Sequence, residues 1–379
     1  MKIGLCACYD TYNYGSQLQS YASLEVLQEL GFDVELIKYK KKVTVTFIVK
    51  SFPRIFNSSF VKRRLKICYN KKMRKKNSLY SEIIRNRNQQ FEKFISDNFS
   101  RYVSVSDGYE QLKENARKYE AFVVGSDQLW LPSGMASNFY NLMFVPDDIK
   151  KVSFATSFGV SCIPRYQEKK TKNYLERFSS ISVREESGKK IIEKLLNRNA
   201  LVVVDPTLML TADKWSEKIG DRLIADDYVF CYFLGNNVLH REIVKKFAKT
   251  NNIKVFNLAY IDEFVESDNY FENVKNVGPF EFVNLIKNAK YIFTDSFHGS
   301  VFSIIFQKLF IVFNRFDEGD KNSRNSRIDN LTKILGLENR RYNGKIETVF
   351  DAIDYKSVLT KLEREREKTR EFLIKSLSC

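Results

Sequence analysis

The sequence predicts an α/β protein built from two doubly wound parallel sheets. Short apolar strands alternate with amphipathic helices along most of the 379 residues, and this alternation is typical of parallel sheets covered by helices on both faces. The rhythm restarts near residue 211, where a second set of strands begins. Polar clusters follow strands of both sets, and ligands bind at such strand ends. We therefore expect two domains that face each other across a cleft.

The first domain is expected to span residues 1–210. Its first strand, "KIGLCAC", leads through a polar loop into a helix over 16–30, where apolar residues recur every four positions and Gly31 ends the pattern. A long polar helix is predicted over 80–98. The remaining strands of this domain are predicted at 33–39, 121–125, 152–159, 180–185 and 200–206, with a helix over 187–196 between the last two.

The second domain is expected to span residues 211–355, and a charged helix is expected to end the chain. This helix is expected in the segment 356–379. Its main part is "SVLTKLEREREKTREFLIKSL". The strands of the second domain are predicted at 228–235, 254–260, 291–295 and 309–314.

Composition excludes several classes of protein. With 44% apolar residues the chain is globular. Its start, "MKIGLCACYD", is too short an apolar run for a secretory signal, and no stretch approaches the roughly 20 apolar residues of a spanning helix, so we expect a cytoplasmic protein. The six cysteines form no C-x-x-C pair and there are only two histidines, so we expect no metal site.

The positive charge is concentrated in one segment, residues 38–80. Fifteen Lys or Arg and no Asp or Glu lie between Leu36 and Ser81, which accounts for nearly all of the net charge of +16. The segment interleaves its charges with apolar residues. Such a mixture suits peripheral binding to an anionic membrane surface, at the inner face of the membrane. A solvated excursion is the alternative. We expect no nucleic-acid partner, because no recognisable nucleic-acid module accompanies the charge.

Two polar clusters precede helices and are candidate binding loops. In "NYGSQLQ", Asn13 and Gly15 lie at the start of the first helix, where free N–H groups favour an anion. In "TDSFHGS", His298 lies between a strand and a helix that begins near Gly299. A histidine in this position can accept a proton from a hydroxyl or donate a hydrogen bond to an anion. Otherwise, it is a structural residue.

Two further strand ends carry charged side chains. Arg184 follows a strand that should be buried, so its guanidinium must find a carboxylate, Asp127 or Glu185, or emerge at the cleft. Asp127 and Gln128 follow another strand in a Gly-Ser loop. These two residues either bind a sugar hydroxyl or cap the next turn.

Taken together, the loops resemble one known family. The motifs "YNYGSQLQSYA", "AFVVGSDQLW", "KVSFATSFG", "ISVREESG", "VVDPTLML", "TDSFHGSVFSIIF" and "NSRI" followed by "LG" occur in the order found in polysaccharide pyruvyl transferases. The resemblance runs from Lys2 to about Leu337. It implies a GT-B-like fold, with two Rossmann-like domains and a C-terminal helix that packs back toward the first.

The resemblance also implies an activity. Such enzymes transfer pyruvate from phosphoenolpyruvate to two hydroxyls of one sugar, which forms a cyclic ketal and releases phosphate. The sugar belongs to a surface polysaccharide, such as an exopolysaccharide or capsule, or to its undecaprenyl-linked precursor. Phosphoenolpyruvate is then a co-substrate, and no cofactor is expected.

The implied roles fall on three groups of residues. The candidate catalytic residues are His298, Asp127 and Asp295. Asp127 and Asp295 are the candidate acids, and the alternative for Asp295 is that it only orients its loop. The candidate donor ligands are Arg184, Ser296, Gly299, Arg327, Asn13 and Gly15. The candidate acceptor ligands are Gln128, Ser126 and Trp130.

One position departs from the family pattern. Many relatives have arginine two positions before this histidine, where this chain has Ser296. An anion contact is then missing at that position. We expect Arg327, in "NSRI", or Arg324 to supply it from a neighbouring loop.

Two other functions remain open at the level of sequence. The architecture alone also fits a GT-B glycosyltransferase that uses a nucleotide sugar. A non-catalytic relative that binds a glycan or a membrane is the second alternative.

Overall fold

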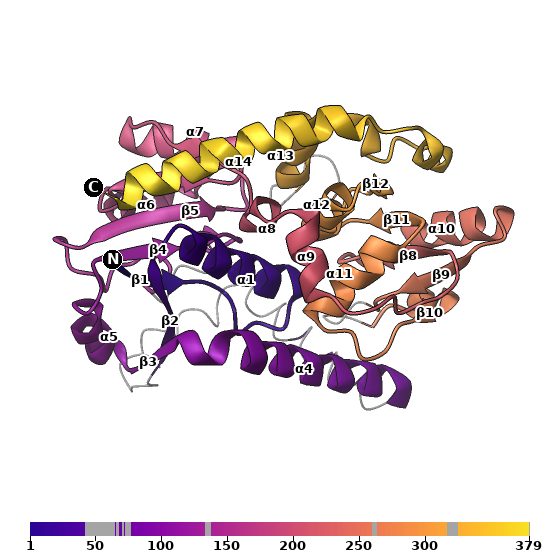
Figure 1. Ribbon diagram of the computed structural model, residues 1–379, viewed down its shortest axis with the longest axis horizontal. Helices are drawn as coiled ribbons and strands as arrows, with labels where there is room; N and C mark the ends of the chain where they lie inside the picture. Colours follow the sequence, from indigo (N-terminus) through magenta and orange to yellow (C-terminus); the bar gives the residue numbers. More distant parts are fainter. Residues whose placement is uncertain are drawn as a thin grey trace.

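The computed structural model describes residues 1–41, 77–132, 138–259, 264–316 and 325–378, together with the single positions 65, 68, 69 and 72. Most of the basic segment 38–80, and Arg324, lie outside these described residues. The described part forms two α/β units, each with its own sheet (Figure 1).

The first sheet has seven strands in the order β3-β2-β1-β4-β5-β6-β7, and all neighbouring strands are parallel. The strands are β1 (Lys2–Cys6), β2 (Asp33–Lys40), β3 (Val103–Asp107), β4 (Ala121–Val124), β5 (Lys150–Thr156), β6 (Ser180–Val183) and β7 (Leu201–Val202). The edge strand β3 was not predicted. Its sequence, "VSVSD", has only one buried side chain and lacks the apolar run of a buried strand.

The second sheet has five strands in the order β10-β9-β8-β11-β12, again all parallel. The strands are β8 (Tyr228–Tyr232), β9 (Lys254–Asn257), β10 (Glu272–Asn273), β11 (Tyr291–Thr294) and β12 (Leu309–Val312). Both sheets therefore confirm the predicted class, α/β with two doubly wound parallel sheets.

Helices cover the sheets. Those of the first unit and the connection are α1 (Tyr14–Glu29), α4 (Ser78–Phe99), α5 (Tyr109–Ala116), α6 (Arg165–Leu175), α7 (Glu186–Leu196), α8 (Pro206–Met209) and α9 (Ala212–Lys218). Those that follow are α10 (Val238–Thr250), α11 (Pro279–Asn288), α12 (Phe297–Ile305), α13 (Ser326–Leu335) and α14 (Tyr355–Leu377). Short 3-10 helices cover Ser100–Tyr102, Glu266–Tyr270, Glu338–Arg340 and Ile346–Phe350. No helix in the described part of the chain is long and apolar enough to cross a bilayer.

Helix α1 lies between the two units and is buried on nearly all sides. The ring of Tyr14 stacks on Phe282 of α11 at 4.9 Å between centroids, and its hydroxyl donates to the carbonyl of Val277 at 2.8 Å. A helix on the outside of one sheet would bury one face only. The junction therefore explains why polar side chains of α1, such as Gln17 and Ser20, are also buried.

Two long helices cross the junction on opposite sides of the molecule (Figure 1). From α14, the Arg366 guanidinium donates to the carbonyl of Leu208 at 2.6 Å, and the Thr369 hydroxyl accepts from Val204 N at 3.3 Å. From α4, Arg87 donates to the carbonyl of Ala259 at 2.6 Å. These contacts fix how the carboxyl ends of the two sheets face each other.

Candidate active site

The candidate site lies where the strand order reverses in both sheets. In the first sheet β1 and β4 are neighbours and lead away in opposite directions, and in the second sheet β8 and β11 do the same. Ligands of doubly wound sheets bind at such switch points. The loop after β1 leads into α1, and the loop after β11 leads into α12. These two helix starts meet at the junction.

The meeting point is a contact between Gly15 and His298. A Cβ atom on Gly15 would lie 2.0 Å from Nδ1 of His298, so only glycine allows the imidazole to pack there. The side chain of His298 is 9% exposed. Asn13 caps α1, because its Oδ1 accepts from the backbone N–H of Ser16 at 3.1 Å. Asn13 and Gly15, both predicted to bind the donor, thus shape the helix start that faces His298.

Arg184 lies directly after β6 and is almost fully buried. Its Nη1 donates to Oδ2 of Asp205 at 2.6 Å and to Oγ of Ser126 at 3.3 Å. Its guanidinium lies 4.4 Å from the ring centroid of Phe297, a cation–π contact with the second unit. Nε and Nη2 have no hydrogen-bond partner among the described residues. Two buried donors are therefore left for a ligand.

Of the two expected carboxylate partners of Arg184, Asp127 is confirmed as a long ion pair and Glu185 is not a partner. Asp127 Oδ1 is 3.9 Å from Nη2, too far for a hydrogen bond. Glu185 accepts instead from Oγ of Ser157 at 2.8 Å and from the backbone N–H of Phe158 at 3.2 Å. The hydrogen-bonded partner, Asp205, was not expected, and it follows β7, which is the neighbour of β6 in the sheet.

Asp127 is held in a strained loop at the edge of the site. Its φ of 79° is rare outside glycine. Its carboxylate accepts from Oγ of Ser16 at 2.6 Å and from N–H of Gln128 at 2.8 Å, and 21% of the side chain is exposed.

The charge state of Asp127 bears on its predicted role as a proton-donating acid. Burial alone would raise the pKa of Asp127, but the charge of Arg184, the hydrogen bond from Ser16, and His298 and Arg327 together lower it. A carboxyl with a lowered pKa is ionised at neutral pH. Asp127 is therefore a hydrogen-bond acceptor in the protein without ligand, which does not favour its predicted role as a proton-donating acid.

Asp295 orients a loop. Its carboxylate accepts from the backbone N–H groups of Leu234 at 2.5 Å and Gly235 at 2.8 Å, directly after β8. Burial raises the pKa of Asp295. Because each of its oxygens is bound to this loop, the structure gives Asp295 the orienting role and does not support a catalytic one.

Ser296 and Gly299 form the cap of α12. Ser296 Oγ accepts from the backbone N–H of Gly299 at 3.3 Å, so this N–H is already used. A Cβ on Gly299 would lie 2.6 Å from Oγ1 of Thr294, so glycine is needed for close packing of α12 on β11. The structure thus gives these two predicted donor ligands a structural role.

Arg327 lies in the first turn of α13 and reaches the same ring as Arg184. Its guanidinium is 5.7 Å from the ring centroid of Phe297. Asn330, one turn further along α13, donates to the carbonyl of Arg184 at 3.2 Å. The structure therefore brings Arg327 into the cluster, as the missing arginine at Ser296 led us to expect.

The three predicted acceptor ligands differ in exposure. Trp130 is completely buried, donates from Nε1 to the carbonyl of Tyr140 at 3.0 Å and packs on Phe158, so its predicted contact with acceptor is wrong. Ser126 is also completely buried and donates to Asp205 at 2.7 Å, so the structure gives it a structural contact and its contact with an acceptor stays a prediction. Gln128 is half-buried at the edge of the site.

Asp205 was not predicted. It accepts hydrogen bonds from Arg184, Ser126 and Thr207, and its Oδ1 lies 3.7 Å from Nε2 of His298. Its place at the end of a strand, in the motif "VVDP", was the signal in the sequence that could have identified it.

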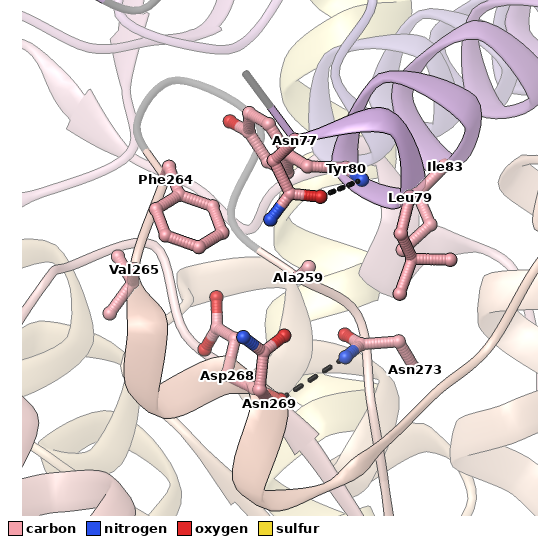
Figure 2. Close-up of a pocket in the computed structure, with 10 residues that line it drawn as sticks. All are labelled: Asn77, Leu79, Tyr80, Ile83, Ala259, Phe264, Val265, Asp268, Asn269 and Asn273. Atoms are coloured by element: carbon pink, nitrogen blue, oxygen red, sulfur yellow. Dashed lines mark hydrogen bonds between the residues drawn. The ribbon is translucent and has the colours of Figure 1, made fainter. Parts of the chain in front are cut away.

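A small pocket lies away from this cluster, between the start of α4 and the second unit (Figure 2). Leu79, Tyr80, Phe264 and Val265 are among the residues that line it. Its volume of about 20 Å³ has room for a single water molecule. It is therefore not a site for a donor or a sugar.

Solved structures with the same architecture are found at low sequence identity. The UDP-GlcNAc 2-epimerase of Neisseria meningitidis, bound to UDP-GlcNAc, has a TM-score of 0.50 and 9% identity, covering 100% of this chain and 99% of that chain. The Methanocaldococcus jannaschii UDP-GlcNAc 2-epimerase, in complex with UDP-GlcNAc and UDP, has a TM-score of 0.48 and 14% identity, with the same two coverages. Similarity at such identities concerns the fold alone, which is GT-B-like.

The sequence comparisons concern the family. No match was found among curated proteins. The model of the polysaccharide pyruvyl transferase family matches residues 13–317, which include α1, Arg184, Asp205 and His298. With most of its length matched, the chain belongs to the polysaccharide pyruvyl transferase family and is a transferase.

Proposed function

We propose that this transferase moves the pyruvyl group of phosphoenolpyruvate onto two hydroxyls of one sugar, forming a cyclic ketal and releasing phosphate. The sugar is part of a polysaccharide or of its lipid-linked precursor. The observation that carries the proposal is the pair of unused buried donors on Arg184, which pairs with the same Asp205 that His298 approaches, in a chain of this family.

The donor requires a site for two anionic groups. Phosphoenolpyruvate carries a carboxylate and a phosphate, and planar guanidinium groups bind both with two parallel hydrogen bonds. Arg184 and Arg327 flank the ring of Phe297, and the first turn of α1 adds the positive end of a helix dipole. These groups support binding of such a donor between the two units.

The reaction balances without any further reactant. The methylene carbon of the donor takes a proton, and the carbon that bears the phosphate gains positive character. The oxygen of one sugar hydroxyl bonds to that carbon, and its proton replaces the one consumed at the methylene. The second hydroxyl then bonds to the same carbon, phosphate leaves with the bonding electron pair, and the hydroxyl proton is carried away by the phosphate.

The described residues suit two roles in these reaction steps. His298 is placed to accept the proton of the attacking hydroxyl. The ionised carboxylate of Asp127 is the more exposed group, and it is placed to accept a hydrogen bond from the sugar and to stabilise positive charge at the reacting carbon. Gln128 follows it in the loop and is the remaining candidate for contact with the sugar.

The test is a reaction of the purified chain with phosphoenolpyruvate and a set of candidate glycans. We expect phosphate to be released only when an acceptor is present, and the product to gain the mass of one pyruvyl ketal. Offering each glycan free and as a lipid-linked form in anionic vesicles adds a test of the segment 38–80, whose charge suits such a surface.

Two variants provide the matched control. His298→Ala should lose transfer, by roughly 100-fold or more. His240→Phe, which changes the other histidine, should retain it. Release of a nucleoside diphosphate from a nucleotide sugar, with phosphoenolpyruvate left intact, would refute the proposal.

A further inference from the structure

The carboxylate of Asp205 accepts four hydrogen bonds from described residues. Its side chain is completely buried and caps the short helix α8. Oδ2 accepts from Nη1 of Arg184 at 2.6 Å and from Oγ of Ser126 at 2.7 Å. Oδ1 accepts from the N–H of Thr207 at 3.0 Å and from its hydroxyl at 2.6 Å. The carboxylate is therefore fixed in orientation, with each oxygen facing a defined direction.

The oxygen bound to Thr207 also faces the second unit. Nε2 of His298 lies 3.7 Å from Oδ1 of Asp205, which is too long for a hydrogen bond but close enough for a small rotation of the imidazole to make one. Nε2 is buried and has no hydrogen-bond partner in the described part of the chain. A buried N–H that lacks an acceptor destabilises the folded protein. Asp205 is the acceptor within reach.

The other nitrogen of the ring faces the opposite helix. Nδ1 lies against Gly15, where a Cβ would approach to 2.0 Å. This is the start of α1, the side from which Ser16 holds Asp127 by a hydrogen bond of 2.6 Å. Nδ1 is therefore the nitrogen on the side of the proposed donor and acceptor.

We propose that Asp205 is a positioning residue that keeps the hydrogen of His298 on Nε2 and leaves Nδ1 as the basic nitrogen. Which reaction the basic nitrogen serves rests on the proposed function. The assignment of the two nitrogens does not, because it follows from the contacts of Asp205 and Gly15 alone. When Nδ1 takes a proton, the resulting imidazolium is stabilised through its Nε2–H by the facing carboxylate.

The charge of Asp205 supports this role. Burial alone would raise its pKa, but His298, Arg184 and Thr207 together lower it strongly. The carboxylate is therefore ionised across the neutral pH range, and an ionised carboxylate can only accept hydrogen bonds. A residue that only accepts selects the tautomer in which the facing nitrogen carries the hydrogen.

The test reads the tautomer directly. In protein labelled with ¹⁵N at histidine, long-range ¹H–¹⁵N correlations at pH 8 distinguish the two tautomers, and the chain has only two histidines. His240→Phe assigns the remaining signal to His298. We expect the Nε2–H form in the free wild-type protein, and a wild-type signal of the Nδ1–H form would overturn the proposal without any variant.

Asp205→Asn should change the tautomer. Arg184 can only donate, so the amide oxygen of the new side chain should face Arg184, and the amide nitrogen should then face His298 as a donor. We expect a shift toward Nδ1–H, with a loss of turnover of about 100-fold or more. Retention of Nε2–H in a folded Asp205→Asn protein would contradict the proposal.

Ser126→Ala is the matched control. It removes a hydrogen bond to Oδ2, the oxygen that does not face His298, so we expect the tautomer to remain Nε2–H. A shift in this variant equal to that in Asp205→Asn would reveal a general effect of packing and overturn the proposal. Because all spectra are recorded without phosphoenolpyruvate, the result stands apart from the outcome of the transfer assay.

Discussion

Two buried arginine–aspartate pairs lie within the described ranges of the chain, each with one of the two histidines beside it. Arg184 and Asp205 lie at the junction with His298, and Arg241 and Asp268 lie within the second unit with His240. The two pairs have the same residue types and similar burial. They differ in how many donors the arginine has already used.

Arg241 holds its own unit together. Nε donates to Asp268 at 2.5 Å, and Nη1 donates to the carbonyls of Gly235 at 3.0 Å and Asn237 at 3.1 Å, in the loop after β8. Arg184 uses only Nη1, and Nε and Nη2 have no hydrogen-bond partner within the described residues. A buried guanidinium that binds backbone carbonyls stabilises a loop, whereas one with two unused nitrogens can bind a ligand.

The histidines each have one buried nitrogen without a hydrogen-bond partner among the described residues, and they differ in what surrounds the ring. His240 packs on the ring of Phe313, with 4.6 Å between centroids, and burial followed by the charge of Arg241 lowers its pKa to about 4. His298 faces the ionised carboxylate of Asp205 on one side and the start of α1 on the other. The comparison shows that residue type and burial do not separate structure from function. The number of unused guanidinium nitrogens does, since among the described residues Arg184 leaves Nε and Nη2 without a hydrogen-bond partner and Arg241 leaves only Nη2.

The largest effect should come from removing each arginine in turn. Arg184→Gln should lower kcat/KM by about 100- to 1,000-fold, because it removes donors aimed at charged groups of the substrate. Arg241→Gln should leave kcat/KM of the folded protein unchanged. Both variants leave a buried carboxylate without its partner, which costs about 3 to 5 kcal/mol of stability.

Turnover and unfolding must therefore be measured on the same samples. Urea unfolding gives the folded fraction, and phosphate release per folded molecule gives kcat/KM. The comparison would break down if both variants lost activity to the same degree after this correction, since Arg241 would then be as important for transfer as Arg184.

A smaller effect should appear in stability against pH. The pKa of His240 is about 4 in the folded chain against 6.5 for an unperturbed histidine. Between these values the unfolded chain binds a proton that the folded chain does not, so stability falls as the pH falls from 6.5 toward 4. The loss amounts to about 1.4 kcal/mol for each pH unit and about 3 kcal/mol in all.

His240→Phe removes this titration and keeps a ring against Phe313. Urea unfolding at pH 7, 6, 5 and 4.5 should show a flatter acid side in the variant than in the wild type, by about 2 kcal/mol at pH 4.5. The carboxylates titrate in both proteins and cancel in the difference. Parallel curves for the two proteins would show that His240 is not buried as a neutral ring.

Much of this organisation could be predicted from the sequence. The strand ends that carry Arg184, Asp127 and His298 were predicted because an apolar run followed by a polar cluster is a local pattern. The arrangement in two doubly wound sheets followed from the alternation of strands and helices. The structure brings all three side chains to one junction, as a cleft between such sheets requires.

The pairings could not be predicted in the same way. Asp205 binds Arg184 because β6 and β7 are neighbours in the sheet, and strand order is not a local property of the chain. Trp130 follows a functional loop in sequence, but its ring points into the core of the first unit. Periodicity places a residue near a strand end and does not tell on which side of the loop its side chain lies.

The smallest effect should come from Arg327, whose guanidinium lies 5.7 Å from the ring centroid of Phe297. It is the candidate replacement for the arginine missing at Ser296. Arg327→Ala should weaken phosphoenolpyruvate binding about tenfold, since one charged hydrogen bond contributes about 1.5 kcal/mol. The turnover number should change little, because Arg184 and His298 remain in place.

Lys333→Ala is the matched control for Arg327→Ala, because Lys333 is an exposed residue of the same helix and its loss changes the net charge equally. Calorimetric titration of each variant with phosphoenolpyruvate distinguishes a direct contact of Arg327 with the donor from a general effect of the positive charge on α13. We expect the affinity of Lys333→Ala to equal that of the wild type. If Arg327→Ala also bound as tightly as the wild type while Arg184→Ala did not bind, Arg327 would not replace the missing arginine, and Arg184 would be the sole guanidinium of the two that holds the donor.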